Sequence, residues 1–416
     1  MFFKVKTSEE VLELLKGFNP IGEETVFMGE GLNRVLAMEI IAGEDLPEFS
    51  RSSMDGYAVR ARDTFGAVET LPALLDVTGE VLMGRAPDGI VSRGKAIRIS
   101  TGGMMPDGAD AVVMLEYCHS LDAGTIEVSR VVSPLENVIS PGDDFKKGAV
   151  IFEKGCLLRP QDLGLLAGLG IQDITVYKRP RVAIISTGDE IVPIDQRPGP
   201  GQVRDINAYT LSAFCRQAGA EPLNLGLCRD SFSDLREMVA GGLEAADTLW
   251  ISGGSSVGTR DLTVKVLESF GDMELLAHGI SISPGKPTII ARIGGRAVFG
   301  LPGHAASAMV VAQVFLTPFL SRLSGERGAF EDNHFYVQAE LERNIESASG
   351  RDDYIRVRLN KRDGRLFAGP IFGKSGLIST LVDAHGLVKI DRNTEGLYQG
   401  QTVNVMLFKD SRGVAY

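Results

Sequence analysis

Apolar residues between positions 181 and 320 follow two patterns that alternate along the chain. The continuous apolar run at Val182–Ser186 is typical of a strand buried on both faces, and two further strands are predicted at Leu223–Leu227 and Thr248–Ser252. Between these runs, apolar residues recur at helical spacing, and we expect Asn207 to cap one such helix and Gly219 to end it. Strands that alternate with helices of about 10–15 residues predict a mostly parallel sheet with helices on both faces.

The end of this region predicts a hairpin and a further helix. Two short apolar runs, Thr288–Ile293 and Arg296–Gly300, are joined by Gly294-Gly295, which is typical of a tight hairpin turn. Helical spacing then continues from about residue 305 to residue 320. Another helix is predicted near the N-terminus, outside this region, where Thr7 and Glu10 form the sequence pair of a capping box.

The chain outside this region is rich in short β-type runs. Residues 46–144 alternate such runs with Gly, Pro and Asp turns, and the same texture returns from Glu331 onward. We therefore predict a multidomain protein of the α/β plus β class. Its centre is a doubly wound, mostly parallel α/β domain, accompanied by a β-rich inserted domain and a C-terminal β-barrel-like domain.

Composition and charge narrow the function classes. The chain has 416 residues with 43 Lys+Arg against 54 Asp+Glu, a net charge of −11, which argues against a broad nucleic-acid-binding face. A local anion site is still compatible with that charge, because a few cations and backbone N–H groups suffice. Continuous apolar runs fall short of the roughly 18 residues that cross a bilayer, and the N-terminus soon becomes acidic. We expect a cytoplasmic protein with no nucleic-acid or membrane partner.

The cysteines and histidines predict no metal site of their own. The four cysteines form no CxxC pair, so a reducing compartment is expected, with Cys215 as a small buried apolar residue. The five histidines are dispersed without a metal-ligand spacing, and only His304 lies in a candidate loop. A nucleophile elbow, which serine hydrolases of the α/β class require, is not found.

Three loops follow predicted strands of the α/β region and contain glycine: Ser186–Glu190, Ser252–Gly258 and Leu301–His304. The carboxyl ends of parallel strands are where such sheets bind ligands. Glycine lets the backbone approach a ligand, and a helix N-terminus favours a phosphate or carboxylate. Ordinary turn chemistry is the alternative for each loop alone, but three at one edge of the sheet favour a site.

Acidic residues also occur in turns elsewhere, in Ser52–Val59, Thr101–Asp110 and Pro141–Asp144, and a Pro-Gly-Lys-Pro segment ends at Pro287. An Asp in a Gly/Pro turn usually only forms the turn. Considered singly, none of these acids is assigned a function.

Considered together, these segments resemble the molybdopterin molybdenumtransferase family, which inserts molybdenum during molybdenum-cofactor synthesis and is related to the E domain of gephyrin. The resemblance covers nearly the whole chain in the order of the family's motifs. It rests on these segments: Ser53–Ala58, Thr101–Glu116, Gly142–Asp144, Ser186–Glu190, Ser252–Asp261, Pro284–Pro287 and Gly300–Gly303. It implies four domains: an α/β molybdopterin-binding domain at 1–23 and 179–326, a linking domain at 24–46 and 145–178, the inserted domain at 47–144, and the C-terminal domain at 327–416.

The resemblance implies the chemistry. Adenylylated molybdopterin and molybdate bind, the metal is placed on the dithiolene, and AMP is released with help from Mg²⁺. The family's acidic positions match Asp55, Asp144, Glu190, Asp230 and Asp261, and Asp55, Glu190 and Asp261 are implied as the Mg²⁺ ligands. Carboxylates near a phosphate repel it unless a hard cation bridges them.

Two further sets of binding residues follow from the resemblance. Molybdate is assigned to Lys286, Ser307, Arg351 and Ser375, since cations and hydroxyl donors suit an oxyanion. The pterin substrate is assigned to Thr101, Thr187, Gly188, Gly253, Gly254, Ser255, Ser256, Gly258, Pro302 and Gly303. A homodimer is implied because the family's site lies between subunits, and a molybdopterin adenylyltransferase is an implied partner.

The sequence departs from the family pattern at Ile139-Ser140-Pro141, at Ser283 and at His304-Ala305. All three departures touch positions that handle anions or shape loops, so a tungstate-preferring paralogue stays an alternative. A non-catalytic pterin-binding scaffold is a second alternative, although retention of all five acids favours the enzyme. The related adenylyltransferase is disfavoured by the two extra β-rich domains.

Overall fold

The computed structural model describes residues 5–122, 124–253, 257–331 and 335–408, without the side chains of residues 257–261. The chain divides into two compact units. The first contains residues 1–38, 154–159 and 173–416, and the second contains residues 39–153 and 160–172.

A six-stranded sheet forms the centre of the first unit, with the strand order β16-β13-β17-β21-β20-β18. The strands from β16 to β21 pair in parallel. β20 pairs antiparallel with β21, and β18 pairs antiparallel with β20. This confirms the predicted mostly parallel sheet and the hairpin at Gly294-Gly295. The strands are β13 (Arg181–Thr187), β16 (Glu221–Cys228), β17 (Thr248–Gly253), β18 (Glu274–His278), β20 (Ile289–Ile293) and β21 (Arg296–Leu301).

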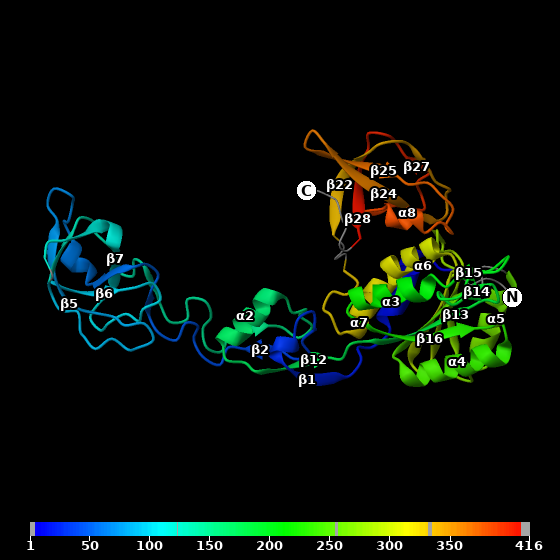
Figure 1. Ribbon diagram of the computed structural model, residues 1–416, viewed down its shortest axis with the longest axis horizontal. Helices are drawn as coiled ribbons and strands as arrows, with labels where there is room; N and C mark the ends of the chain where they lie inside the picture. Colours follow the sequence, from blue (N-terminus) through cyan, green and yellow to red (C-terminus); the bar gives the residue numbers. More distant parts are fainter. Residues whose placement is uncertain (1–4, 123, 254–256, 332–334, 409–416) are drawn as a thin grey trace. The chain divides into compact units, whose positions relative to one another are not determined.

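Helices cover both faces of this sheet (Figure 1). Side chains alternate along β17, so Trp250 packs on the face covered by α1, α3, α6 and α7, while Leu249 and Ile251 pack on the face covered by α4 and α5. The two-sided burial explains why the central strands β13 and β17 are apolar along almost their whole length. The helices are α1 (Ser8–Lys16), α3 (Asn207–Gln217), α4 (Phe232–Ala245), α5 (Val257–Glu268), α6 (Ala305–Val311), the π-helical turn η4 (Ala312–Leu316) and α7 (Thr317–Leu323).

The helix starts show one confirmed prediction and one error. Thr7 and Glu10 form the capping box of α1 as predicted. Asn207 does not cap α3; it is the first residue of that helix, and the carboxylate of Asp205 instead accepts the Ala208 backbone N–H at 3.0 Å. The Asn207 side chain is thereby released for contacts described below.

One helical stretch, Ala305–Leu323, is long and apolar enough by composition to cross a membrane, with a mean hydropathy of 1.4. Its 18-residue window is 72% buried within the fold, where Phe315 and Phe319 contribute to the core. We therefore interpret it as a core helix of the α/β sheet.

The C-terminal part of the first unit is a closed five-stranded barrel, in the order β24-β25-β22-β28-β26 with β26 returning to β24. Its interior is apolar, as the fully buried Val357, Ala368 and Val405 show. The sequence did not predict β25. The strands are β22 (Tyr336–Leu341), β24 (Asp352–Arg362), β25 (Arg365–Pro370), β26 (Gly386–Ile390) and β28 (Thr402–Leu407), joined by β23 (Ile345–Glu346), β27 (Gly396–Leu397) and the short helix α8 (Ser379–Val382).

The barrel is attached to the α/β domain by direct strand pairing. A two-residue strand, β19 (Ile282–Ser283), leaves the α/β domain and pairs in parallel with Asp352 and Asp353 of β24. Tyr354 and Leu387 of the barrel belong to the same buried cluster as Phe299 of the sheet. These contacts bring the β24 side chains against the loops of the α/β domain.

Smaller elements complete the first unit. β1 pairs antiparallel with β12, which is far away in the sequence, and β14 pairs in parallel with β15 next to the first candidate loop. These elements are β1 (Glu23–Phe27), η1 (Met28–Glu30), β12 (Asp173–Tyr177), β14 (Ile191–Val192) and β15 (Val203–Arg204).

The second unit is built on a six-stranded sheet with the order β7-β4-β6-β5-β9-β8, as its β-rich sequence predicts. Ile126 and Val112 lie in its two apolar clusters. Its elements are β2 (Ile40–Ile41), β3 (Arg51–Ser52), β4 (Gly56–Val59), η2 (Ala61–Thr64), β5 (Ala73–Glu80), β6 (Lys95–Ile99), β7 (Ala111–Met114), η3 (Leu115–Tyr117), β8 (Cys118–Ser120), β9 (Thr125–Val128), β10 (Val138–Ile139), β11 (Val150–Phe152) and α2 (Pro160–Gly168).

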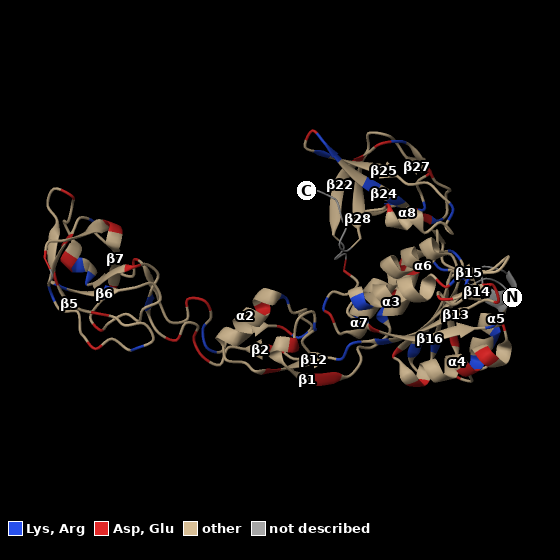
Figure 2. Cartoon of the chain, viewed as in Figure 1, with Lys and Arg blue, Asp and Glu red and all other residues tan. Residues whose placement is uncertain are grey.

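This architecture confirms the predicted α/β plus β class with a barrel at the C-terminal end. The four domain boundaries stay a prediction, because the division into two units does not test them. Figure 2 shows Lys and Arg interspersed with Asp and Glu along both units. Charge alone therefore does not single out a functional face.

Candidate functional site

The carboxyl ends of β13, β17 and β21 meet at one edge of the sheet, as expected for the three candidate loops. Thr187 lies beside Gly253 in the register of β13 and β17. A Cβ at Gly253 would lie 2.0 Å from the Thr187 carbonyl oxygen, so this position requires glycine. Asn207 connects the loop after β17 to the loop after β21. Its Nδ2 donates to Ser252 Oγ at 2.7 Å and to the Gly303 carbonyl at 2.8 Å.

Two of the predicted acids lie near Thr187, the last residue of β13: Glu190 follows β13, and Asp230 follows the neighbouring strand β16. Asp230 accepts a hydrogen bond from the Thr187 hydroxyl at 2.9 Å. The Glu190 carboxylate lies over Gly188, whose φ is +145°, and a Cβ there would come within 2.5 Å of Glu190 Oε2. Glycine at position 188 thus allows Glu190 to fold back towards the loop. The loop presents carboxylate oxygens at the edge where a ligand is expected.

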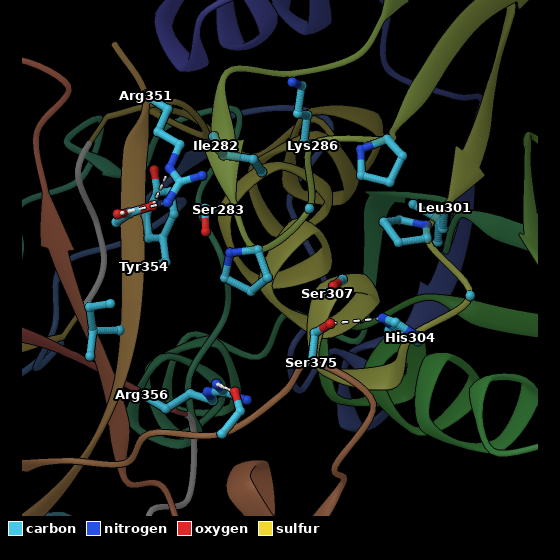
Figure 3. A pocket seen from close by; sticks show the side chains of 18 of the residues that line it. Ile282, Ser283, Lys286, Leu301, His304, Ser307, Arg351, Tyr354, Arg356 and Ser375 are labelled. Atoms are coloured by element: carbon cyan, nitrogen blue, oxygen red, sulfur yellow. Dashed lines mark hydrogen bonds and ion pairs between the residues drawn. The ribbon is translucent and has the colours of Figure 1, made fainter. Parts of the chain in front are cut away.

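A cavity of about 570 Å³ lies between the loops of the α/β domain and the barrel. Figure 3 shows side chains from both domains around it. All four residues assigned to molybdate line this cavity, as do three of those assigned to the pterin: Lys286, Ser307, Arg351, Ser375, Gly253, Pro302 and Gly303. The structure therefore brings together residues that are up to 122 positions apart in the chain, from Gly253 to Ser375.

The cations of the cavity differ in how they are neutralised. Arg351 Nε lies 2.9 Å from Asp353 Oδ1 in an ion pair, and the Asp353 side chain is only 5% exposed. Among the described residues, Lys286 has no acidic partner within ion-pair distance. The cavity therefore contains positive charge that an anion could neutralise.

Ser375 is held at the cavity by the start of α6. Its carbonyl accepts the Ala306 backbone N–H at 3.2 Å, and its hydroxyl lies 2.7 Å from His304 Nδ1 (Figure 3). Ser307 lies one residue further along α6 and is 6% exposed. The departure of the sequence at His304 thus supplies a direct contact to Ser375.

Asp55, Thr101 and Asp144 belong to the second unit. Thr101 donates its backbone N–H at 2.7 Å and its hydroxyl at 3.0 Å to Asp55 Oδ1. These two hydrogen bonds are the main reason why the pKa of the Asp55 carboxyl lies below its ordinary value. Asp144 is exposed, and its backbone N–H donates to the Leu46 carbonyl at 3.0 Å.

The remaining predicted residues belong to the glycine- and serine-rich loop. Gly254, Ser255 and Ser256 lie outside the described residues, and Gly258 and Asp261 lie within α5 without described side chains. Among the residues whose side chains are described, no group of three His, Cys, Asp or Glu is arranged to hold a metal ion. The Mg²⁺ set of Asp55, Glu190 and Asp261 therefore stays a prediction.

Comparison with known proteins decides the family. The model of the MoeA N-terminal region (domain I and II) matches residues 6–170, the model of the probable molybdopterin binding domain matches residues 183–322, and the model of the MoeA C-terminal region (domain IV) matches residues 338–408. A molybdopterin molybdenumtransferase of Haemophilus influenzae is 32% identical over 95% of this chain and 96% of its own length. The chain belongs to the molybdopterin molybdenumtransferase family.

Two further relatives agree with this assignment. A protein of Methanocaldococcus jannaschii, provisionally named for molybdopterin biosynthesis, is 36% identical over 91% of each chain. The crystal structure of the molybdopterin biosynthesis moeA protein of Pyrococcus horikoshii OT3 has a TM-score of 0.85 and 32% identity, covering 97% of this chain and all of that one. This molybdopterin molybdenumtransferase family member is thus a transferase of molybdenum-cofactor biosynthesis.

The structure adds residues to the site of this family member that the sequence did not single out. Asn207 joins two loops, Asp353 neutralises Arg351, and Arg356 of β24 lines the cavity from the barrel. Asn207 was expected to cap a helix, and neither Asp353 nor Arg356 was singled out. Their roles depend on the contact between the barrel and the α/β domain, which no local pattern indicates.

Proposed function

We propose that this protein transfers molybdenum from molybdate to adenylylated molybdopterin and releases AMP. The cavity at the carboxyl edge of the sheet is the observation that supports this proposal most strongly. It combines Lys286, which has no acidic partner among the described residues, with the hydroxyl groups of Ser307 and Ser375, a set of donors suited to a tetrahedral oxyanion. The cavity adjoins the loops that would hold the pterin nucleotide, so the metal donor and acceptor would lie close together.

The protein's own residues would bind and orient the two substrates. Lys286, Ser307, Arg351 and Ser375 would hold molybdate, and the backbones of Thr187, Gly188, Gly253, Pro302 and Gly303 would approach the pterin nucleotide. The resemblance adds Thr101, Gly254, Ser255, Ser256 and Gly258 to the second set. Gly253 and Gly188 are positions where a side chain would block such an approach.

The acids would act at the adenylate link. Glu190 follows β13 and Asp230 follows β16, so both lie at the carboxyl edge of the sheet, where they could orient a water molecule towards the phosphate. Asp55, Asp144 and Asp261 are assigned the same chemistry by resemblance. Oxygen ligands of this kind suit a hard cation, and bound Mg²⁺, held by Asp55, Glu190 and Asp261, would neutralise the phosphate during AMP release.

The assembly and partner are part of the same proposal. We expect a homodimer, and we expect a molybdopterin adenylyltransferase to supply the adenylylated substrate. The test is to incubate the purified full-length protein with adenylylated molybdopterin, Mg²⁺ and either molybdate or tungstate, and to quantify AMP. Molybdate-dependent release of AMP supports the proposal; release with tungstate alone identifies a tungstate-preferring paralogue. Tight pterin binding without AMP release identifies a scaffold and overturns the proposal.

A further inference from the structure

The N-terminal segment, residues 6–8, is hydrogen-bonded to a part of the α/β domain that also carries the barrel. Lys6 pairs with residues 279–283, and its carbonyl accepts the Ser281 N–H at 2.8 Å. The Ser281 carbonyl in turn accepts the Asp352 N–H of β24 at 3.0 Å. Residues 279–283 therefore lie between the N-terminal segment and the barrel strand β24.

Ser8, the first residue of α1, adds a direct side-chain contact between the N-terminal segment and the barrel. Its hydroxyl donates to Asp352 Oδ2 at 2.6 Å, and the two residues are only 4% and 2% exposed. Asp352 Oδ1 accepts the Arg392 backbone N–H at 3.0 Å, and Lys389 Nζ lies 3.6 Å from Asp352 Oδ2. A buried carboxylate is stable only where it is paired and hydrogen-bonded. Asp352 therefore depends on partners from both the N-terminal segment and the barrel.

The segments that this network joins also carry two cations of the cavity (Figure 3). Arg351 directly precedes Asp352 and lines the cavity from the barrel. Lys286 lines it from the α/β domain, and the Lys286 carbonyl accepts the Ile280 N–H at 2.9 Å. The distance between the two cations therefore depends on how β24 is held against residues 279–283. A binding site must keep its side chains within about 0.5 Å of the productive geometry.

We propose that Asp352 is a positioning residue of the oxyanion site. Held by Ser8, it keeps β24 in the position from which Arg351 contacts the same anion as Lys286. This inference rests on the proposed function for the identity of the anion, which is molybdate. Asp352 does not contact the anion itself, because its carboxylate is buried and both oxygens accept hydrogen bonds from the protein. A change at Ser8 therefore alters the site without replacing any residue that lines the cavity.

A general contribution to stability is the competing explanation, because Val11 and Leu15 of α1 are fully buried in the core. Arg322 of α7 provides the matched control. Its Nε donates to the Phe18 carbonyl at 2.8 Å, so it holds the residues that follow α1 within the α/β domain. Arg322→Ala removes a contact at the other end of the same helix and leaves the contact to the barrel unchanged.

The test measures molybdate binding to the purified full-length protein by calorimetry, with urea unfolding of each variant alongside. We expect Ser8→Ala to bind molybdate about 3- to 10-fold more weakly than wild type, which corresponds to one hydrogen bond. Asp352→Asn should also bind more weakly, because an amide retains only one of the two acceptor oxygens. Ser8→Thr keeps the hydroxyl group and should restore the affinity. Arg322→Ala should change the affinity by less than about threefold, even if it is destabilised as much as Ser8→Ala.

Hydrogen exchange, followed by mass spectrometry of peptides that contain residue 352, gives a readout that needs no ligand. The Asp352 N–H donates to Ser281 between the two segments. It should exchange about 3- to 10-fold faster in Ser8→Ala than in wild type, and at the wild-type rate in Arg322→Ala. In the AMP-release assay, Ser8→Ala should raise the KM for molybdate and leave kcat unchanged, because the acids at the adenylate link are intact.

Three results would overturn the inference. They are wild-type affinity for molybdate in both Ser8→Ala and Asp352→Asn, an equal loss of affinity in Arg322→Ala, and unchanged exchange of the Asp352 N–H in Ser8→Ala. Wild-type protein that binds no molybdate would instead contradict the proposed function. The exchange of the Asp352 N–H would then decide by itself whether Ser8 holds β24 in place.

Discussion

Thr101 donates two hydrogen bonds to a single oxygen of Asp55, one from its backbone N–H at 2.7 Å and one from its hydroxyl at 3.0 Å. The resemblance assigns Asp55 to the catalytic acids and Thr101 to the residues that bind the substrate. In the second unit these two residues contact each other. The pair favours the ionised form of an exposed carboxyl group, because both hydrogen bonds require the oxygen to act as an acceptor.

Thr101→Val should raise the pKa of Asp55 towards its ordinary value, because it removes the hydroxyl donor and keeps the backbone donor. A lowered carboxyl pKa stabilises the fold above the unfolded-state pKa, and this contribution is lost as pH falls through the folded-state pKa. The contribution should therefore be smaller in the variant, and its loss should be complete at a higher pH than in the wild type. Carbon-13 NMR titration of the Asp55 carboxyl group measures the midpoint, and Thr101→Ser should leave it near the wild-type value. Equal midpoints in Thr101→Val and wild type would refute the relationship.

Asn207→Ala should reduce both stability and ligand binding, because the Asn207 amide joins the Ser252 loop to the Gly303 loop. The loss of buried hydrogen bonds should lower the free energy of unfolding by about 1–3 kcal/mol. Thr248→Val is the matched control, since it removes the buried bond from Thr248 to the Ala297 carbonyl at the opposite end of β17.

Both variants should be less stable in urea unfolding, but only Asn207→Ala should lose the thermal stabilisation that molybdate produces. If the control loses that stabilisation to the same extent, Asn207 has no special relation to the site.

His304→Ala should weaken molybdate binding by about 3- to 10-fold, which corresponds to one ordinary hydrogen bond. The reason is that His304 Nδ1 lies 2.7 Å from the Ser375 hydroxyl and holds it in one orientation. In the variant this hydroxyl group can rotate, so binding the anion costs the entropy of ordering it. His119→Ala, at an exposed position of β8, is the control and should bind molybdate as wild type does. Unchanged affinity in His304→Ala would show that the contact does not serve the anion.

Asp261→Asn should slow AMP release more than it weakens pterin binding, because the carboxylate follows the loop where the phosphate is expected. This prediction rests on the sequence and on the position of Asp261 in α5. Glu268→Gln lies at the other end of the same helix and should release AMP at the wild-type rate. Single-turnover measurements separate the two steps, and wild-type kinetics in Asp261→Asn would exclude a catalytic role.

Local patterns predicted those parts of the fold in which neighbouring residues determine the structure. The run at Val182–Ser186 became β13 because both faces of that strand are covered by helices. The turn at Gly294-Gly295 became a hairpin because both glycines have positive φ, +57° and +79°. The same reasoning placed the helix cap wrongly at Asn207, since the competing side chain of Asp205 lies only two residues earlier.

The site could be predicted only in part, because its residues come from separate elements. Sequence motifs identified Lys286 and Ser375, but their shared cavity depends on the pairing of β19 with β24. Arg356 gave no signal in the sequence, where an arginine in a strand normally reaches solvent. Its burial and its place in the cavity wall depend on the contact between the barrel and the α/β domain, which only the folded chain shows.

The central claim is molybdate-dependent transfer in the cavity around Lys286, and the most direct measurement is AMP release from adenylylated molybdopterin. We predict that the wild-type protein releases AMP only when both molybdate and a divalent cation are present, and that exhaustive chelation abolishes release. Lys286→Ala should no longer saturate with molybdate at practical concentrations. AMP release that is independent of molybdate, or that Lys286→Ala carries out with the wild-type dependence on molybdate, would contradict the account.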